Sequence, residues 1–204
     1  MIENKLSRVI SYVFHPLLMP SYILLLLLNL NTLLSLSLPP AYKISLVGVV
    51  FLTTVLFPLL LTWIFYRLKI ISSLFMNSKE ERIYPILAIS VFYYLTYFLL
   101  RGIHISTIFS YYMLGATLLS IMSLVVNFYR KISLHMIGIG GFTGLFLGLA
   151  LNFGINLTIE VTAAIMLAGV IGFARLKSDS HDPAEIYSGF IMGALTMTLL
   201  MMIL

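Results

Sequence analysis

Residues 134–151 read LHMIGIGGFTGLFLGLAL, a stretch without Lys, Arg, Asp or Glu. A run of this length and apolarity can cross the hydrocarbon core of a bilayer as an α-helix. Gly140, Gly144 and Gly148 recur in it at every fourth position. Small residues at this spacing let two helix backbones approach closely in lipid. The stretch therefore predicts a membrane-spanning helix at the centre of a tightly packed bundle.

Six further apolar runs surround this one, and the composition of the whole chain agrees with them. Of the 204 residues, 61% are hydrophobic and only 9% are charged, whereas a soluble globular domain carries about 25% charged residues. We therefore expect an all-α integral membrane protein, a single membrane domain over residues 1–204 with six to seven transmembrane helices and short interfacial helices. The chain has no cysteine, which excludes disulfides, thiolate metal sites and cysteine nucleophiles. The other predicted spans are Leu17–Leu38, Ile44–Tyr66, Tyr84–Leu100, Thr107–Phe128, Leu157–Ala174 and Ile186–Leu204.

Small residues also recur every four positions in the last two spans, as Ala164, Ala168 and Gly172 and as Gly189 and Gly193. We expect the fifth span, 134–151, to contact the sixth or the seventh through its glycines.

Two shorter stretches have the spacing of amphipathic helices that lie along the headgroup plane. The apolar positions of the first are Leu6, Val9, Ile10, Val13 and Leu17, beside Lys5, Arg8 and Ser11. Those of the second are Ile70, Ile71, Leu74 and Phe75, beside Lys69, Ser72, Ser73 and Asn77.

Charge predicts the orientation. If all seven runs cross the membrane, ten of the twelve Lys and Arg residues fall on the side of the N-terminus, and only Lys43 and Arg101 fall on the other. The positive-inside rule makes the first side cytoplasmic. Three polar clusters also reach that side: KEERIYP (79–85), RKISLH (130–135) and ARLKSDSHDPAE (174–185).

These clusters supply the candidate site residues. Asp182 and Pro183 are typical of a helix start, so His181 could be no more than an exposed loop residue. Alternatively, Glu185, four residues on, could hold one ring nitrogen of His181 and leave the other free as a nucleophile or base. His135 and Ser133 open the fifth span, where Ser133 could simply cap the helix.

Each of the three cations in these clusters has two possible interpretations. Arg175, Arg82 and Lys79 are either interfacial anchors and solvated charges or ligands for an anion, and the planar guanidinium group suits phosphate. We interpret His15 and His104 as structural or interfacial residues. Glu160 lies a few residues inside the sixth span, and an intramembrane carboxylate is a functional candidate.

The motif Arg175-x5-His181-x3-Glu185, followed by a glycine-containing helix, resembles the third motif of the type 2 phosphatidic acid phosphatase superfamily, Ser-Arg-x5-His-x3-Asp. Ser133-Leu134-His135 is similar to the end of its second motif, Pro-Ser-Gly-His, and 79–85 lies where its first motif, Lys-x6-Arg-Pro, belongs. The order of the three motifs is the same, and the resemblance covers about 67–200. This chain departs from the family at Ala174, Glu185, Ile132 and Leu134, and in the spacing of Lys79, Arg82 and Pro85.

The resemblance implies a metal-independent lipid phosphatase without a cofactor, in which His181 forms a phosphohistidine and Glu185 orients it. His135 would protonate the leaving oxygen and then activate water, while Arg175, Arg82, Lys79 and Ser133 would bind the phosphate. It implies a lipid phosphate or diphosphate as substrate, membrane lipids and no nucleic acid as partners, and a bacterial inner membrane as location. Two alternatives remain: a silent relative that binds or moves anionic lipids, and a small channel or transporter using Glu160. The sequence leaves the oligomeric state open.

Overall fold

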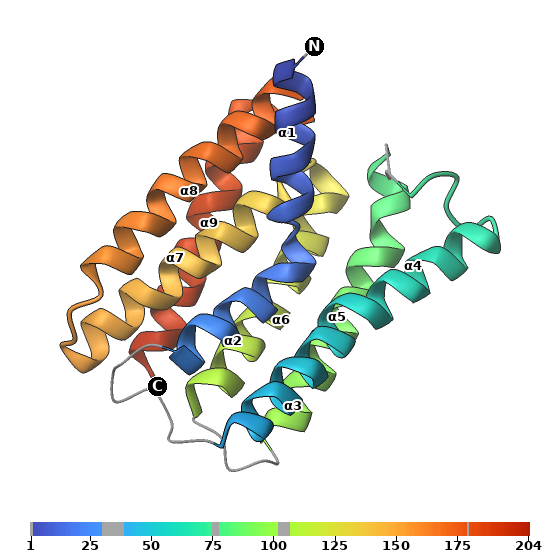
Figure 1. Ribbon diagram of the computed structural model, residues 1–204. Coiled ribbons are helices and arrows are strands. Elements are labelled where there is room, and N and C mark those ends of the chain that lie inside the picture. Colours follow the sequence, from blue (N-terminus) through green and yellow to red (C-terminus); the bar gives the residue numbers. More distant parts are fainter. Residues whose placement is uncertain (1, 30–38, 75–77, 102–106, 179) are drawn as a thin grey trace. The chain divides into compact units, whose positions relative to one another are not determined.

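The structure is a computed structural model that describes residues 2–29, 39–74, 78–101, 107–178 and 180–204 (Figure 1). It is 86% helical, with no strand in the described ranges. Seven helices within those ranges are long and apolar enough to cross a membrane, which confirms the predicted all-α class and the number of candidate spans. The elements are α1 (Ile2–Val13), the 3-10 turn η1 (Pro16–Leu18), α2 (Met19–Asn29), α3 (Pro40–Phe51), the π-helical turn η2 (Leu52–Leu56), α4 (Phe57–Arg67), α5 (Lys79–Arg101), α6 (Thr107–Tyr129), α7 (Leu134–Phe153), α8 (Thr158–Lys177) and α9 (Pro183–Met202).

Large apolar side chains are exposed along these helices. Ile44, Met166 and Phe173 are 73%, 69% and 62% exposed. Outward-facing apolar side chains of this kind are what a surface in contact with lipid needs, whereas a water-soluble protein keeps exposed apolar patches small. The surface and the seven long apolar helices together indicate an integral membrane protein.

The chain forms two compact units. One contains residues 1–19 and 129–204, and the other contains residues 20–128. The first holds α1, η1, α7, α8 and α9.

The centre of the first unit is the contact between α7 and α9 (Figure 1). Gly140 and Gly144 lie directly against the backbone of α9, where an added Cβ would overlap the carbonyl oxygens of Phe190 and Ala194. In return, Gly193 of α9 lies against the backbone of α7 at Ile137 and Gly141. The expectation that the fifth span packs through its glycines is confirmed, and its partner is the seventh span.

The helix α8 packs against α7 and α1, and it also contacts α9. Ala164 and Ile171 of α8 are fully buried, and a Cβ on Gly172 would lie 3.5 Å from Ile186 Cγ2 of α9. Gly169, by contrast, faces open space. The small residues of α8 therefore allow it to pack closely on one side only.

The N-terminal amphipathic stretch is a helix, as predicted. Its charged residues, Lys5 and Arg8, are exposed, and its serines turn toward the protein. Leu6 and Val9 are 60% and 55% exposed, whereas Ser7 is buried and Ser11 is half-buried. Together with η1 and α2, α1 forms a candidate span over Lys5–Asn29. Residues 30–38, the predicted end of the first span, lie outside the described residues.

In the second unit, two sequence-based boundaries are wrong. The third span begins at Lys79 instead of Tyr84, so Glu80, Glu81 and Arg82 lie in the first turns of α5. The predicted amphipathic helix after Arg67 is not helical over 68–74. Lys69 adopts a left-handed conformation (φ 59°) and Ile70 N–H donates to Phe65 O at 2.9 Å, a pattern that terminates α4.

The segment after α4 is then held by α5, because Ser72 N–H donates to Glu81 Oε1 at 2.6 Å. Phe75 and Asn77 of the predicted amphipathic stretch, and His104, lie outside the described residues.

Candidate functional site

The His181 and Glu185 side chains form a close ionisable pair in the first unit. His181 Nδ1 lies 2.6 Å from Glu185 Oε2, and the two side chains are 3% and 16% exposed. With Nδ1–H donating to the carboxylate, the other ring nitrogen, Nε2, keeps its lone pair. The alternative in which His181 is merely an exposed loop residue is therefore wrong, and the spacing-based expectation of a His–Glu pair is confirmed.

Local sequence explains why this pair forms. Asp182 is the N-cap of α9 and its Oδ1 accepts from Glu185 N–H at 2.7 Å, with Pro183 at the first helical position. The cap fixes the first turn of α9, so Glu185 points back toward the residue before the cap. In a capping box the side chain at this position would bond the N-cap backbone, but here it holds His181 instead.

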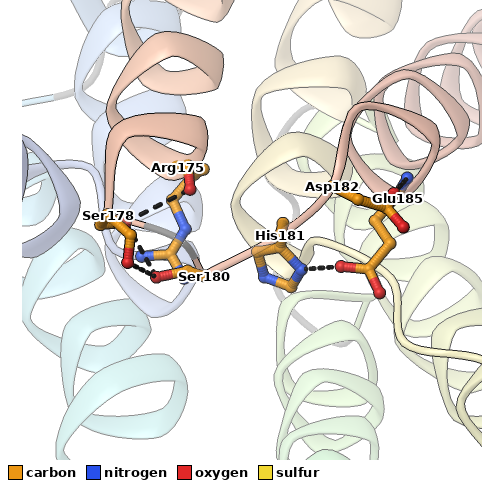
Figure 2. Close-up of polar contacts among 6 residues, drawn as sticks. All are labelled: Arg175, Ser178, Ser180, His181, Asp182 and Glu185. Carbon is orange, nitrogen blue, oxygen red and sulfur yellow. Dashed lines mark hydrogen bonds and ion pairs between the residues drawn. The ribbon is translucent and has the colours of Figure 1, made fainter.

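Arg175 approaches the same region from the last turn of α8. Figure 2 shows Arg175 at the end of α8, beside Ser178 and Ser180, and the His181 ring farther along the chain, turned toward Glu185. The loop folds back on the end of α8: Ser180 N–H donates to Arg175 O at 3.3 Å, and the Ser178 and Ser180 hydroxyls lie 2.8 Å apart. This turn connects Arg175 to His181 with few residues between them.

His135, in the first turn of α7, is held by the N-terminal helix. Its Nε2–H donates to Ser11 O at 3.0 Å, which leaves Nδ1 as the free nitrogen of the neutral ring. Arg175 Nη1 donates to Ser11 Oγ at 3.2 Å. Arg175 and His181 both lie within electrostatic range of the His135 ring. One serine of α1 thus contacts two of the predicted site residues.

His15 lies beside His135. The two ring centroids are 5.6 Å apart at an interplanar angle of 79°. His15 also caps η1, because its Nδ1 accepts from Leu17 N–H at 3.3 Å. The interpretation of His15 as a structural residue is correct for this cap, but the ring also forms part of the wall around His135.

Ser133 occupies the N-cap position of α7 without making a side-chain cap. It is fully buried, and its hydroxyl has no hydrogen-bond partner among the described residues. Its backbone N–H donates to Glu185 O at 3.4 Å, which joins the start of α7 to the start of α9. Ser133 is therefore a buried hydroxyl with unused hydrogen-bonding capacity beside the His181–Glu185 pair.

The structure thus brings together five of the seven predicted site residues: His181, Glu185, His135, Arg175 and Ser133. The other two, Lys79 and Arg82, belong to the second unit, where Lys79 Nζ donates to Phe128 O at 3.3 Å. Their phosphate-binding role stays a prediction. Glu160 lies half-buried in the first turn of α8 and also stays untested.

Sequence reasoning missed the parts played by Ser11 and His15. The usable signal was their position: both precede the first long apolar run on the side where the polar clusters were expected to emerge. Their partners are 120 or more residues away in sequence, at His135 and Arg175, so no local motif connects them.

The permanent cation among these groups is the guanidinium of Arg175, which suits an anion. Three imidazole rings lie near it, the Glu185 carboxylate is engaged by His181, and the Asp182 carboxylate caps α9. Among the described residues, no three His, Cys, Asp or Glu side chains are placed to share a metal ion. Comparison of the chain with protein-family models, curated proteins and solved structures finds no match.

Proposed function

We propose that this chain is an integral membrane lipid phosphatase, a divergent member of the type 2 phosphatidic acid phosphatase superfamily. Its substrate is a phosphate monoester or diphosphate of a lipid. The observation that carries the proposal is the nearly buried His181–Glu185 pair, at 2.6 Å, beside Arg175 and His135. The sequence order of these residues is that of the family motifs.

In this proposal His181 is the nucleophile. Glu185 accepts a hydrogen bond from Nδ1–H and so fixes the tautomer of the ring, with the proton on Nδ1 and the lone pair on Nε2. Nε2 then attacks phosphorus, and the bond from phosphorus to the leaving oxygen breaks. As the new N–P bond develops, positive charge grows on the ring, and the carboxylate of Glu185 stabilises it. Water then attacks the phosphohistidine, which releases inorganic phosphate and restores the free ring.

His135 acts as the acid and then the base. In the proposed cycle the His135 ring starts doubly protonated and keeps its Nε2–H on Ser11 O, so Nδ1 passes its proton to the leaving oxygen. The ring is then neutral, and Nδ1 takes a proton from the attacking water, which restores the starting state. Arg175 binds the phosphate oxygens through its planar donors and stabilises the charge that they carry in the transition state. Ser133 adds a further donor, and a phosphate-binding role for Lys79 and Arg82 stays a prediction from the sequence.

The chain's surface fits a substrate dissolved in the bilayer. A lipid phosphate would reach the site laterally, with its headgroup at the membrane surface and its acyl chains among exposed apolar side chains. The family resemblance implies a bacterial inner membrane as the location, and the asymmetric Lys and Arg distribution favours the cytoplasmic side for the site.

The test is phosphate release by the purified full-length protein in detergent micelles, without added metal, from a panel of lipid phosphates and diphosphates. We expect turnover in the wild type and a loss on the order of 10³-fold or more in His181→Ala. Asp182→Asn is the matched control, because asparagine also caps a helix and only a charge is removed next to His181. Full activity in His181→Ala would refute the nucleophile assignment.

One observation favours a second candidate, a relative that binds anionic lipids without turnover. The His135 ring donates a hydrogen bond to Ser11 O and packs against the His15 ring, so these two residues cover part of the His135 ring. Such a protein would bind orthovanadate, a mimic of the transferring phosphoryl group, yet release no phosphate from any lipid of the panel.

A further inference from the structure

The N-terminal helix supplies a residue to this site from outside the region that resembles the phosphatase family. Ser11 is half-buried on the inward side of α1, and α1 packs against α8. Its two polar groups go to two different site residues: the hydroxyl accepts from Arg175 Nη1 at 3.2 Å, and the carbonyl accepts from His135 Nε2–H at 3.0 Å. The hydroxyl itself donates to Ser7 O at 2.9 Å.

We propose that Ser11 is a positioning residue for the phosphate site. It holds the Arg175 guanidinium group in a fixed position relative to the acid–base histidine, His135. This inference rests on the proposed function, because it assigns Ser11 a role in binding and transferring the same phosphoryl group.

The geometry of the donors supports this role. A guanidinium group on a long, flexible side chain loses conformational entropy whenever it must meet an anion in one orientation. Ser11 Oγ, itself oriented by Ser7 O, holds Nη1 in place before the substrate arrives. The planar fork of a guanidinium group presents several N–H donors, in a geometry that matches phosphate oxygens.

The carbonyl contact acts on the other partner. With Nε2–H bound to Ser11 O, the proton-transferring atom of His135 must be Nδ1. His15, four residues after Ser11, places its ring against His135 and limits ring rotation. The same helix therefore orients both the cation and the acid–base group.

The test compares Ser11→Ala with Ser11→Thr, which restores a hydroxyl. Each variant is assayed as full-length protein in micelles for turnover of a lipid phosphate and, separately, for orthovanadate binding by calorimetry. We expect Ser11→Ala to weaken vanadate binding and to lower kcat/KM by about tenfold, the size of one hydrogen bond to a charged group. Ser11→Thr should recover most of both.

A matched control is Ser45→Ala, because the Ser45 hydroxyl makes the same kind of contact, to Ala41 O four residues earlier at 3.0 Å, on an exposed face of α3 in the second unit. It should change neither readout.

The outcomes separate this inference from the proposed function. Turnover in the wild type with unchanged kinetics and binding in Ser11→Ala overturns the inference and leaves the function standing. Vanadate binding without turnover overturns the function, and the inference then stands if Ser11→Ala weakens that binding and falls if it does not. A wild type that neither binds vanadate nor turns over overturns both.

Discussion

Replacing Gly144 by alanine should loosen the contact between α7 and α9. A Cβ at this position would overlap the Ala194 carbonyl oxygen and lie 3.0 Å from Ala194 Cα. Both obstacles are backbone atoms, so the helices must move apart locally. Forcing an extra carbon into packed structure costs about 1–3 kcal/mol.

The same movement stretches the hydrogen bond from Thr198 Oγ1 to Gly144 O, now 3.2 Å long. Hydrogen bonds between membrane helices contribute about 0.6–1.7 kcal/mol each. Together the two effects give a loss of about 2–4 kcal/mol in the free energy of unfolding. Alanine also favours the helix over glycine by about 1 kcal/mol, which offsets part of that loss.

A second variant removes this offset from the comparison. Gly169→Ala, in α8, makes the same chemical change where nothing lies within 4 Å of the new methyl group. The two variants should therefore differ by about 2–4 kcal/mol, with Gly144→Ala the less stable. The assay is unfolding in mixed micelles by SDS titration, followed by circular dichroism. Equal stability of the two variants would refute the close backbone approach.

Three further predictions concern the site. Glu185→Gln, which keeps an acceptor but removes the charge, should lower kcat by about 10²-fold with little change in vanadate affinity, as steady-state kinetics and calorimetry would show; an unchanged kcat would exclude Glu185 as the partner of the nucleophile. Arg175→Lys should lower kcat/KM by about 10- to 100-fold, the size of a lost hydrogen bond to a charged group, because an ammonium cannot replace the planar fork; wild-type kinetics would place the phosphate elsewhere. His15→Asn keeps an acceptor for Leu17 N–H, so it should be about 1 kcal/mol more stable in SDS titration than His15→Ala, which lacks the cap; equal stabilities would show that the cap contributes nothing.

The features predicted correctly from sequence are those encoded over a few residues. The four-residue spacing of Gly140, Gly144 and Gly148 predicted a close helix contact, and α9 provides it. The four-residue spacing of His181 and Glu185 predicted their pairing, because one helical turn after the cap brings the carboxylate back to the ring. Periodicity and capping are local properties, so a single sequence contains them.

The errors have physical causes as well. The stretch after Arg67 has helical periodicity, yet the left-handed conformation of Lys69 ends the helix there. The backbone N–H of Ser72 then donates to the side chain of Glu81, a contact that no local sequence pattern predicts. The polar side of α1 was expected to face water at the headgroup plane. Lys5 and Arg8 are exposed, but Ser11 turns toward the protein, where its hydroxyl accepts a hydrogen bond from Arg175 Nη1, a partner far away in the sequence.

Packing and site geometry depend on one another in this unit. His135 lies in the first turn of α7 and Glu185 in the first turn of α9, so the distance between the His135 ring and the Glu185 carboxylate follows from how those two helices meet. Near that end, a Cβ on Gly189 would lie 3.0 Å from Ser133 O, and Ser133 N–H reaches Glu185 O at 3.4 Å. The glycines that bring α7 and α9 together therefore also set the separation of the two histidines, because a wider spacing there would move Ser133 and His135 away from Glu185 and His181. The glycine stripe, which carries no chemistry of its own, is in this way a determinant of the site.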